Sequence, residues 1–206
     1  MDPHRLQQQI TFILEIDKLK SVLRQTYITI DERHENSAEH SWHLATMALI
    51  LIDHAEEKID LCHVLKLLLV HDIIEIDAGD TYCYDELETK DQSAREHQAA
   101  ERIFSLLPED QANTMCDLWL EFESRNTPEA KFAVALDCLM PLLHNLHTEG
   151  KSWQEHNITM DQVITRNRAI SDGSAQLWQF AQSIIKQAVT TGYLAAPDGS
   201  VSEDMK

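Results

Sequence analysis

The stretch Leu67-Leu68-Leu69-Val70-His71-Asp72-Ile73-Ile74 is the most informative part of this sequence, because it places two ionisable residues inside an apolar run. Burying an unpaired carboxylate is costly, so Asp72 persists in such a run only where something compensates its charge. A metal ion is the strongest compensator. The alternatives from this run alone are a hydrogen-bonded His71–Asp72 pair in the core, or a helix face that reaches solvent.

Two other segments repeat this pattern. Asp137 is the single charged residue in the apolar run 132–140, where it could also cap a neighbouring helix or pair with an arginine. His40 and His43 follow Glu39 three residues apart, a spacing that lets both side chains point to one side of a helix. Ordinary core or solvent-facing histidines are the alternative for both.

Together these segments supply a ligand set of two imidazoles and two carboxylates from three expected helices, namely His40, His71, Asp72 and Asp137. Such a set suits one divalent metal ion such as Mn, Co, Fe, Ni or Mg, with its remaining positions open to water. Structural zinc would favour thiolates instead.

Composition and periodicity predict an all-α, single-domain bundle of roughly six to eight helices. The chain of 206 residues holds only five glycines and five prolines, too few for a turn-rich β-sandwich, and no convincing strand pair is found. We expect a domain over residues 1–194 and a disordered tail over 195–206. Apolar spacing predicts helices over about 5–26, 37–55, 60–75, 91–107, 109–124, 127–149, 159–172 and 174–191.

Local signals set several of these helix ends. Asn36 or Ser37, Asp60 and Thr127 are expected N-caps. Pro141 should kink the helix that contains it or end its first half. Residues 76–90 read as a loop, and its segment 77–85 could form a lid or a substrate wall.

Charge and cysteine usage exclude several classes of partner. The chain has 35 acidic against 17 basic side chains and a formal charge of −18, which disfavours nucleic-acid polymers and anionic membranes. The sequence predicts no signal peptide and no membrane span. The four cysteines (62, 83, 116 and 138) form no CxxC pair and read as reduced core residues of a cytoplasmic protein.

The ordered pattern H…HD…D resembles the HD-domain metal-dependent phosphohydrolase superfamily. The match is closer to the small 5′-nucleotidase-like branch, which includes bacterial 5′-deoxynucleotidases, and it covers roughly residues 10–145. The segments that carry it are Glu35-Asn36-Ser37-Ala38-Glu39-His40-Ser41, His71-Asp72-Ile73-Ile74-Glu75 with Gly79-Asp80, and Ala130-Lys131-Phe132 leading to Leu136-Asp137.

This resemblance implies roles for particular residues. The metal ligands are then His40, His71, Asp72 and Asp137, and His43 is left to support them or to pack. Glu75 and Asp80 are implied to activate the attacking water or to hold the sugar hydroxyl. Arg24 matches the phosphate-binding arginine of the family, and Arg33 is a second candidate for phosphate contact. Gln25 stands where the bacterial deoxynucleotidases carry an aromatic residue near the sugar, so the sugar preference stays open.

The resemblance therefore implies an enzyme that releases phosphate from a nucleoside 5′-monophosphate by attack of a metal-activated water. A small phosphorylated substrate and a homodimer are the implied partners. The alternatives are another HD-type phosphoesterase, acting on cyclic nucleotides or nucleotide polyphosphates, and a binding module that keeps its metal pocket without turnover. Glu75 and Asp80 argue against the binding module, because a pocket kept only for packing does not need them.

Overall fold

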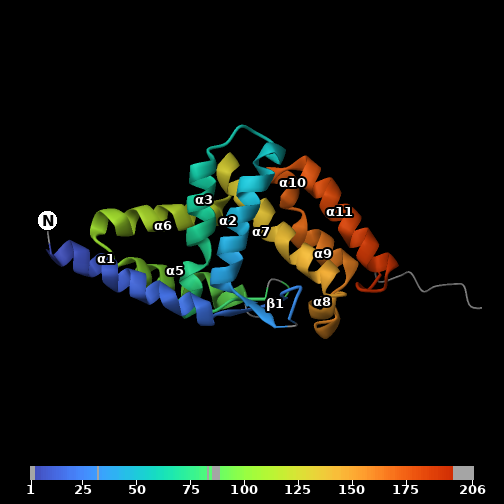
Figure 1. Cartoon of the computed structure of the whole chain (residues 1–206), viewed down its shortest axis with the longest axis horizontal. Helices are drawn as coiled ribbons and strands as arrows, with labels where there is room; N and C mark the ends of the chain where they lie inside the picture. The colour runs from blue at the N-terminus through green and yellow to red at the C-terminus, as the bar shows by residue number, and fades with distance from the viewer. Residues whose placement is uncertain (1–2, 32, 83, 85–88, 197–206) are drawn as a thin grey trace, which may run out of the picture.

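The computed structural model describes residues 3–31, 33–82, 84 and 89–196, and it is helical almost throughout (Figure 1). Within these residues eight α-helices have eight or more residues, which confirms the expected all-α class. They are α1 (Pro3–Glu15), α2 (Ser37–Leu51), α3 (Leu61–Val70), α5 (Thr89–Phe104), α6 (Glu109–Ser124), α7 (Pro128–His147), α9 (Met160–Asn167) and α11 (Ala175–Thr190). Three shorter helices are α4 (Glu75–Ala78), α8 (Lys151–Glu155) and α10 (Ile170–Gly173).

The predicted N-caps form as expected. Asn36 caps α2 by accepting a hydrogen bond from the Glu39 amide at 3.0 Å. Asp60 caps α3 through the Cys62 amide, and Thr127 caps α7 through the Ala130 amide. Each cap satisfies a backbone N–H that the helix itself leaves unpaired. The caps at Asn36 and Thr127 fix where α2, which carries His40, and α7, which carries Asp137, begin.

The N-terminal segment differs from the expected helix over 5–26. The α-helix ends at Glu15, a 3₁₀ helix η1 follows over Ile16–Ser21, and strand β1 (Leu23–Tyr27) pairs antiparallel with β2 (His34–Asn36). This hairpin was not predicted, although the residues around Tyr27 are β-branched or aromatic and favour strands. The pairing places Arg24 and Glu35 side by side, with 3.9 Å between Nε and Oε2.

The expected helix over 60–75 also divides near its C-terminal end, where His71 and Asp72 lie. Helix α3 stops at Val70, and His71–Ile74 form the 3₁₀ helix η3 before α4 begins. The tighter turn rotates His71 and Asp72 relative to the preceding helix. A second short 3₁₀ helix, η2 (Ile52–His54), follows α2 in the same way.

The C-terminal half contains more elements than predicted. Helix α7 continues past Pro141 to His147, so the proline does not end it. Helix α8 lies between the helices predicted over 127–149 and 159–172, and the second of these divides into α9 and α10. The Ala195 carbonyl accepts a hydrogen bond from the Met160 amide at 3.0 Å, which joins the end of the described chain to the start of α9. The rest of the predicted tail, from residue 197, lies outside the described residues, as do residues 83 and 85–88 of the predicted loop.

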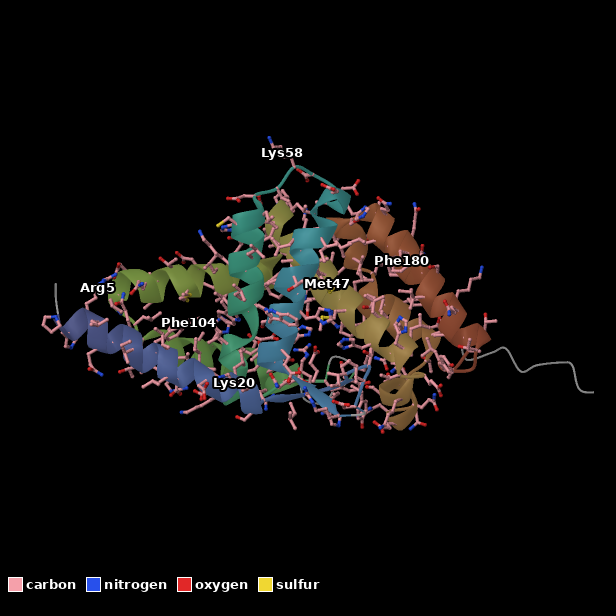
Figure 2. All side chains as sticks on the ribbon, viewed as in Figure 1. Arg5, Lys20, Met47, Lys58, Phe104 and Phe180 are labelled. Atoms are coloured by element: carbon pink, nitrogen blue, oxygen red, sulfur yellow. The ribbon has the colours of Figure 1, made fainter. Side chains whose placement is uncertain are left out.

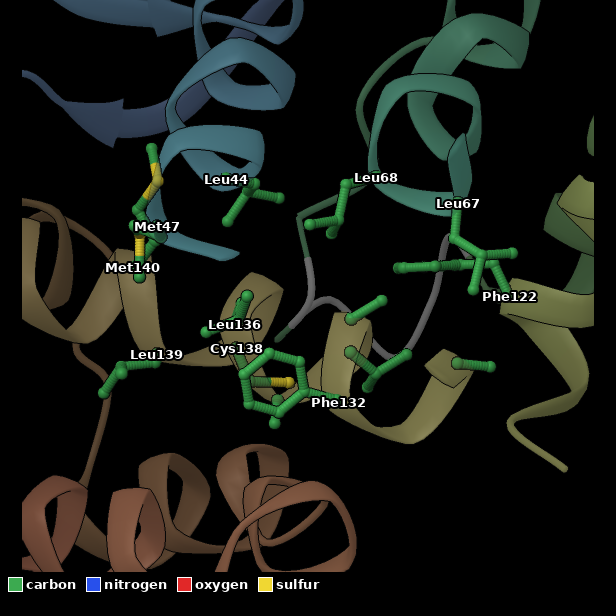
Figure 3. Packing of buried hydrophobic residues seen from close by; sticks show 14 of the residues in the cluster. Leu44, Met47, Leu67, Leu68, Phe122, Phe132, Leu136, Cys138, Leu139 and Met140 are labelled. Carbon is green, nitrogen blue, oxygen red and sulfur yellow. The ribbon is translucent and has the colours of Figure 1, made fainter. Parts of the chain in front are cut away.

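Helix α7 lies at the centre of the bundle and contacts α2, α3, α6, α9, α10 and α11. Its side chains meet those of α2 and α3 in the core, where Leu44, Leu68, Phe132 and Leu136 are fully buried (Figure 3). Phe180 on the outer face of α11 stays half exposed, at the edge of the molecule (Figure 2). Within the described part of the chain, no helix combines the length and the apolar character that crossing a bilayer requires.

Gly173 lets α10 approach α7 closely, which gives a test of the packing. A Cβ at this position would lie 2.4 Å from the Lys131 carbonyl oxygen and 2.9 Å from the Ala135 Cβ. We expect Gly173→Ala to lower the free energy of unfolding by about 1–3 kcal/mol, the usual cost of overpacking, in urea denaturation. The exposed neighbour Asp172→Ala should stay within about 0.5 kcal/mol of wild type. Equal stability of the two variants would show that α10 and α7 are not packed this tightly.

Candidate metal centre and active site

The HD pair lies in η3, at the buried end of α3. Both His71 and Asp72 are almost fully buried, as the apolar run around them predicted. The Nδ1 atom of His71 lies 2.9 Å from the Leu68 carbonyl oxygen. Because a carbonyl can only accept, a neutral His71 ring carries its proton on Nδ1 and has its Nε2 lone pair facing inward.

His40 reaches the same place from the first turn of α2 and is completely buried. Its Nδ1 lies 3.1 Å from Glu35 Oε2, and its Nε2 lies 2.9 Å from Asp137 Oδ1 on α7. Glu35 therefore orients the ring from behind, in the way carboxylates orient metal-binding histidines. A proton on Nδ1, facing Glu35, leaves Nε2 to bind a cation together with the Asp137 carboxylate.

Four expected ligand side chains thus converge on one point. His71 Nε2 lies 3.0 Å from Asp72 Oδ1 and 3.9 Å from Asp137 Oδ1, yet it has no hydrogen-bond partner. Ligand atoms of His40, His71 and Asp72 all lie within 4.8 Å of one another. A buried imidazole nitrogen without a partner is costly unless a cation completes it. The donor set therefore fits a divalent metal ion, with both imidazoles offering Nε2.

The electrostatics of this cluster favour positive charge. Burial disfavours the imidazolium form, but the Asp72 and Asp137 carboxylates outweigh burial and raise the pKa of His71 to about 9. Burial alone would raise the pKa of Asp72, but the charges of His71 and Arg24 lower it to about 2. The same balance, led by the His40 hydrogen bond and charge, lowers the pKa of Asp137. A divalent cation would meet the same negative field.

Arg24, Glu75 and Asp80 lie directly beside the ligands. Arg24 Nη1 is 3.0 Å from Asp72 Oδ2, 3.8 Å from Glu75 Oε1 and 3.6 Å from Asp80 Oδ1. Ser37 Oγ donates a 2.6 Å hydrogen bond to Glu75 Oε2. Burial and the neighbouring Asp72 raise the pKa of Glu75 well above its usual value, which suits a group that exchanges protons.

Arg33, the second predicted phosphate contact, lies elsewhere. Its guanidinium donates to both carboxylate oxygens of Glu39, at 3.0 and 2.8 Å, and its side chain is half exposed. Arg33 is not among the residues that line the cavity beside the ligands. The structure therefore brings Arg24, and not Arg33, to the predicted cluster.

A cavity of about 200 Å³ opens beside the cluster. Residues of the predicted substrate wall line it, including Tyr82 and Tyr84, together with Gln25. Its far wall was not predicted and comes from the C-terminal half of the chain: Asn145, Ser152, Trp153, Arg166 and Asn167. Asn145 is buried, and its Oδ1 atom has no hydrogen-bond partner. Sequence spacing could not have predicted this amide oxygen, because its burial depends on tertiary packing.

The fold and this cluster define the class of the protein: an all-α scaffold that gathers two imidazoles and two carboxylates from α2, η3 and α7 into a buried candidate metal site. The chain belongs to the HD-domain family, because the model of that family, described as HD domain, matches residues 16–178. The match extends beyond residue 145, where the predicted resemblance ended, and includes α8, α9 and α10.

Sequence relatives support this membership. The chain is 33% identical over 135 residues to the Homo sapiens protein named 5′-deoxynucleotidase HDDC2, and the match covers 65% of each chain. The Mus musculus protein of that name is also 33% identical, over 129 residues that cover 62% of this chain and 63% of the relative. The chain thus matches just under two thirds of the length of these relatives.

Solved structures agree with the fold. A structure from Magnetospirillum magnetotacticum MS-1, described as a predicted metal-dependent phosphohydrolase, is 50% identical with a TM-score of 0.89. The alignment covers 93% of this chain and 96% of that one. An HD-domain phosphohydrolase from Listeria innocua shares the fold at 16% identity, with a TM-score of 0.60 over 88% of this chain and 90% of that one.

Proposed function

We propose that this protein is a metal-dependent phosphohydrolase that releases inorganic phosphate from nucleoside 5′-monophosphates. The observation that carries the proposal is the convergence of His40, His71, Asp72 and Asp137, with an unpartnered His71 Nε2, beside a cavity that Arg24 lines. The names of the relatives, 5′-deoxynucleotidase and predicted metal-dependent phosphohydrolase, support the same reaction class.

In the proposed reaction a water oxygen attacks phosphorus, the bond from phosphorus to the 5′-oxygen breaks, and nucleoside and phosphate leave. The bound divalent ion, one of Mn, Co, Fe, Ni or Mg, would lower the pKa of a water molecule and polarise a phosphoryl oxygen. Glu75 and Asp80 would accept the proton of the attacking water or hold a sugar hydroxyl. The Arg24 guanidinium would offset the charge that develops on the phosphoryl oxygens.

The C-terminal wall of the cavity is the proposed site of the nucleoside. Asn145 Nδ2 donates to the Pro141 carbonyl at 3.0 Å, which orients the amide and leaves Oδ1 to accept from a sugar hydroxyl or a base amino group. Trp153 and Tyr82 provide aromatic surface in the same cavity. A nucleotide could therefore place its phosphate near Arg24 and its nucleoside against α7 and α8.

We also propose that the protein is a homodimer and resides in the cytoplasm. Trp42, Leu49 and Ile50 are exposed large apolar side chains at helical spacing on α2, which would suit a contact between two copies. Within the described part of the chain, Cys62, Cys116 and Cys138 form no disulfide bond, as a reducing compartment allows.

The proposed reaction is tested by phosphate release from a panel of phosphate esters. The panel holds ribo- and deoxyribonucleoside 5′-monophosphates, 3′,5′-cyclic nucleotides and nucleoside triphosphates, each assayed with Mn²⁺, Co²⁺, Ni²⁺, Fe²⁺ and Mg²⁺. We expect kcat/KM for at least one 5′-monophosphate to exceed kcat/KM for every cyclic nucleotide and triphosphate by about tenfold or more. Preferred hydrolysis of a cyclic nucleotide or a triphosphate would assign another phosphoesterase activity. No release with any metal would leave a binding module.

A further inference from the structure

A second group of metal-ligating side chains lies on the Nδ1 side of His40, away from the site described above. It consists of Glu35 at the end of the hairpin, His43 on α2 and His144 on α7. One carboxylate oxygen and one nitrogen from each histidine lie within 4.8 Å of one another. The same closeness holds for His40, His71 and Asp72. The resemblance left His43 to support the ligands or to pack, and the sequence pattern assigned no role to His144.

His144 supplies an independent sign of a binding site. Its side chain is 8% exposed, and its Nδ1 is buried without a hydrogen-bond partner. Glu35 Oε2 lies 3.9 Å from that nitrogen, too far for a hydrogen bond. Metal bonds of about 2.1 Å place two donors of one ion about 3–4 Å apart, so this separation suits a shared cation. The ring of His43 lies beside that of His144, with 5.8 Å between centroids.

We propose that Glu35, His43 and His144 form a second site that binds a transition-metal ion of the Zn²⁺ type. Two imidazoles and one carboxylate are a ligand set that Zn²⁺ takes in proteins, whereas Mg²⁺ and Ca²⁺ prefer oxygen donors throughout. Because His43 is only partly buried, the ion can reach the site from solvent on that side.

Glu35 couples this second site to the first. Its Oε2 lies 3.1 Å from His40 Nδ1 and 3.9 Å from His144 Nδ1. An ion bound at Glu35 therefore changes the charge behind His40, and each site alters the metal affinity of the other. The second site holds the His40 ring in place and tunes the first site, and it takes no part in the bond-breaking step.

Measuring bound metal tests this proposal without any assay of activity. The second site can therefore be confirmed or rejected independently of the proposed reaction. Chelator-stripped protein is dialysed to equilibrium against buffered Zn²⁺ alone, and bound zinc per chain is measured by mass spectrometry. His43→Gln and His144→Gln should each lose one zinc per chain relative to wild type, or bind it about tenfold or more weakly. His147→Gln, an exposed histidine on the same helix as His144, is the matched control and should bind as wild type does.

A double variant with His71→Gln and Asp72→Asn separates the two sites. It should keep one zinc, and adding His43→Gln should remove that zinc. Folding of each variant is checked by thermal melting, and the partly buried His43 keeps the test valid if His144→Gln unfolds. The proposal is overturned if wild type, His43→Gln and every folded His144→Gln sample bind the same amount of zinc, or if His147→Gln loses as much.

Discussion

Replacing Asp137 with asparagine is expected to abolish nearly all phosphate release, by at least about a hundredfold in kcat/KM. Losing a residue that hydrogen-bonds to a metal ligand typically lowers metal affinity or activity by about 10–100-fold. Asp137 is an expected ligand itself, so its loss should cost more. Its Oδ1 lies 2.9 Å from His40 Nε2 and 3.9 Å from His71 Nε2, so the carboxylate faces both imidazoles at once. The neutral amide keeps the shape of the side chain and removes the negative charge that holds the cation.

Thermal stability provides a second measurement on the same variant. A ligand that binds only the folded protein stabilises it by about 2.7 kcal/mol at a hundredfold excess over Kd. Added Mn²⁺ or Co²⁺ should therefore raise the Tm of stripped wild-type protein, and Asp137→Asn should lose most of that rise. Asp117→Asn, an exposed aspartate on α6, is the control and should keep both the activity and the shift. Full activity in Asp137→Asn would remove Asp137 from the metal centre.

Arg24→Ala is the second change with a large expected effect. The Arg24 side chain is 13% exposed and lies within 4 Å of carboxylate oxygens of Asp72, Glu75 and Asp80. Losing one such preorganised donor costs about 10²–10³ in kcat, so we expect a loss in that range with weaker inhibition by inorganic phosphate. Arg24→Lys should recover only part of the activity, because an ammonium lacks the two-pronged guanidinium geometry.

The stability of Arg24→Ala should depend on metal in a particular direction. Removing one partner from a buried ion pair costs about 3–5 kcal/mol, because the remaining carboxylates are left uncompensated. A divalent cation supplies positive charge to the same carboxylates, so added metal should raise the Tm of Arg24→Ala more than that of wild type. Arg95→Ala, an exposed arginine on α5, is the control for both readouts. Unchanged kcat and stability in Arg24→Ala would place Arg24 outside the site.

The ligand cluster could be predicted from the sequence because charged residues stand inside apolar runs there. His71, Asp72 and Asp137 interrupt apolar runs, and such interruptions are rare enough to mark a site without knowledge of the fold. The caps at Asn36, Asp60 and Thr127 were accessible for a similar reason, since capping depends on a few neighbouring residues. Local sequence therefore predicted the eight longer helices and singled out these residues as candidates, and the resemblance assigned them their roles as ligands.

Features that depend on contacts between distant segments were not predicted. The 3₁₀ turn at His71 has no sequence signal of its own, because the apolar run looks like continued α-helix. The pairing of β1 with β2 uses residues that read as helix or connector, and it places Arg24 beside Glu35. The cavity wall at Asn145 and Arg166 belongs to α7 and α9, whose approach follows from tertiary packing alone.

The central claim is that a divalent cation held by His40, His71, Asp72 and Asp137 makes this protein a phosphohydrolase. Stripped wild-type protein is reconstituted with increasing Mn²⁺ or Co²⁺, and bound metal and phosphate release from a nucleoside 5′-monophosphate are measured in the same samples. We predict that release is near background without metal and rises in proportion to bound metal until that site is filled. Stripped protein that releases phosphate as fast as reconstituted protein would contradict the account.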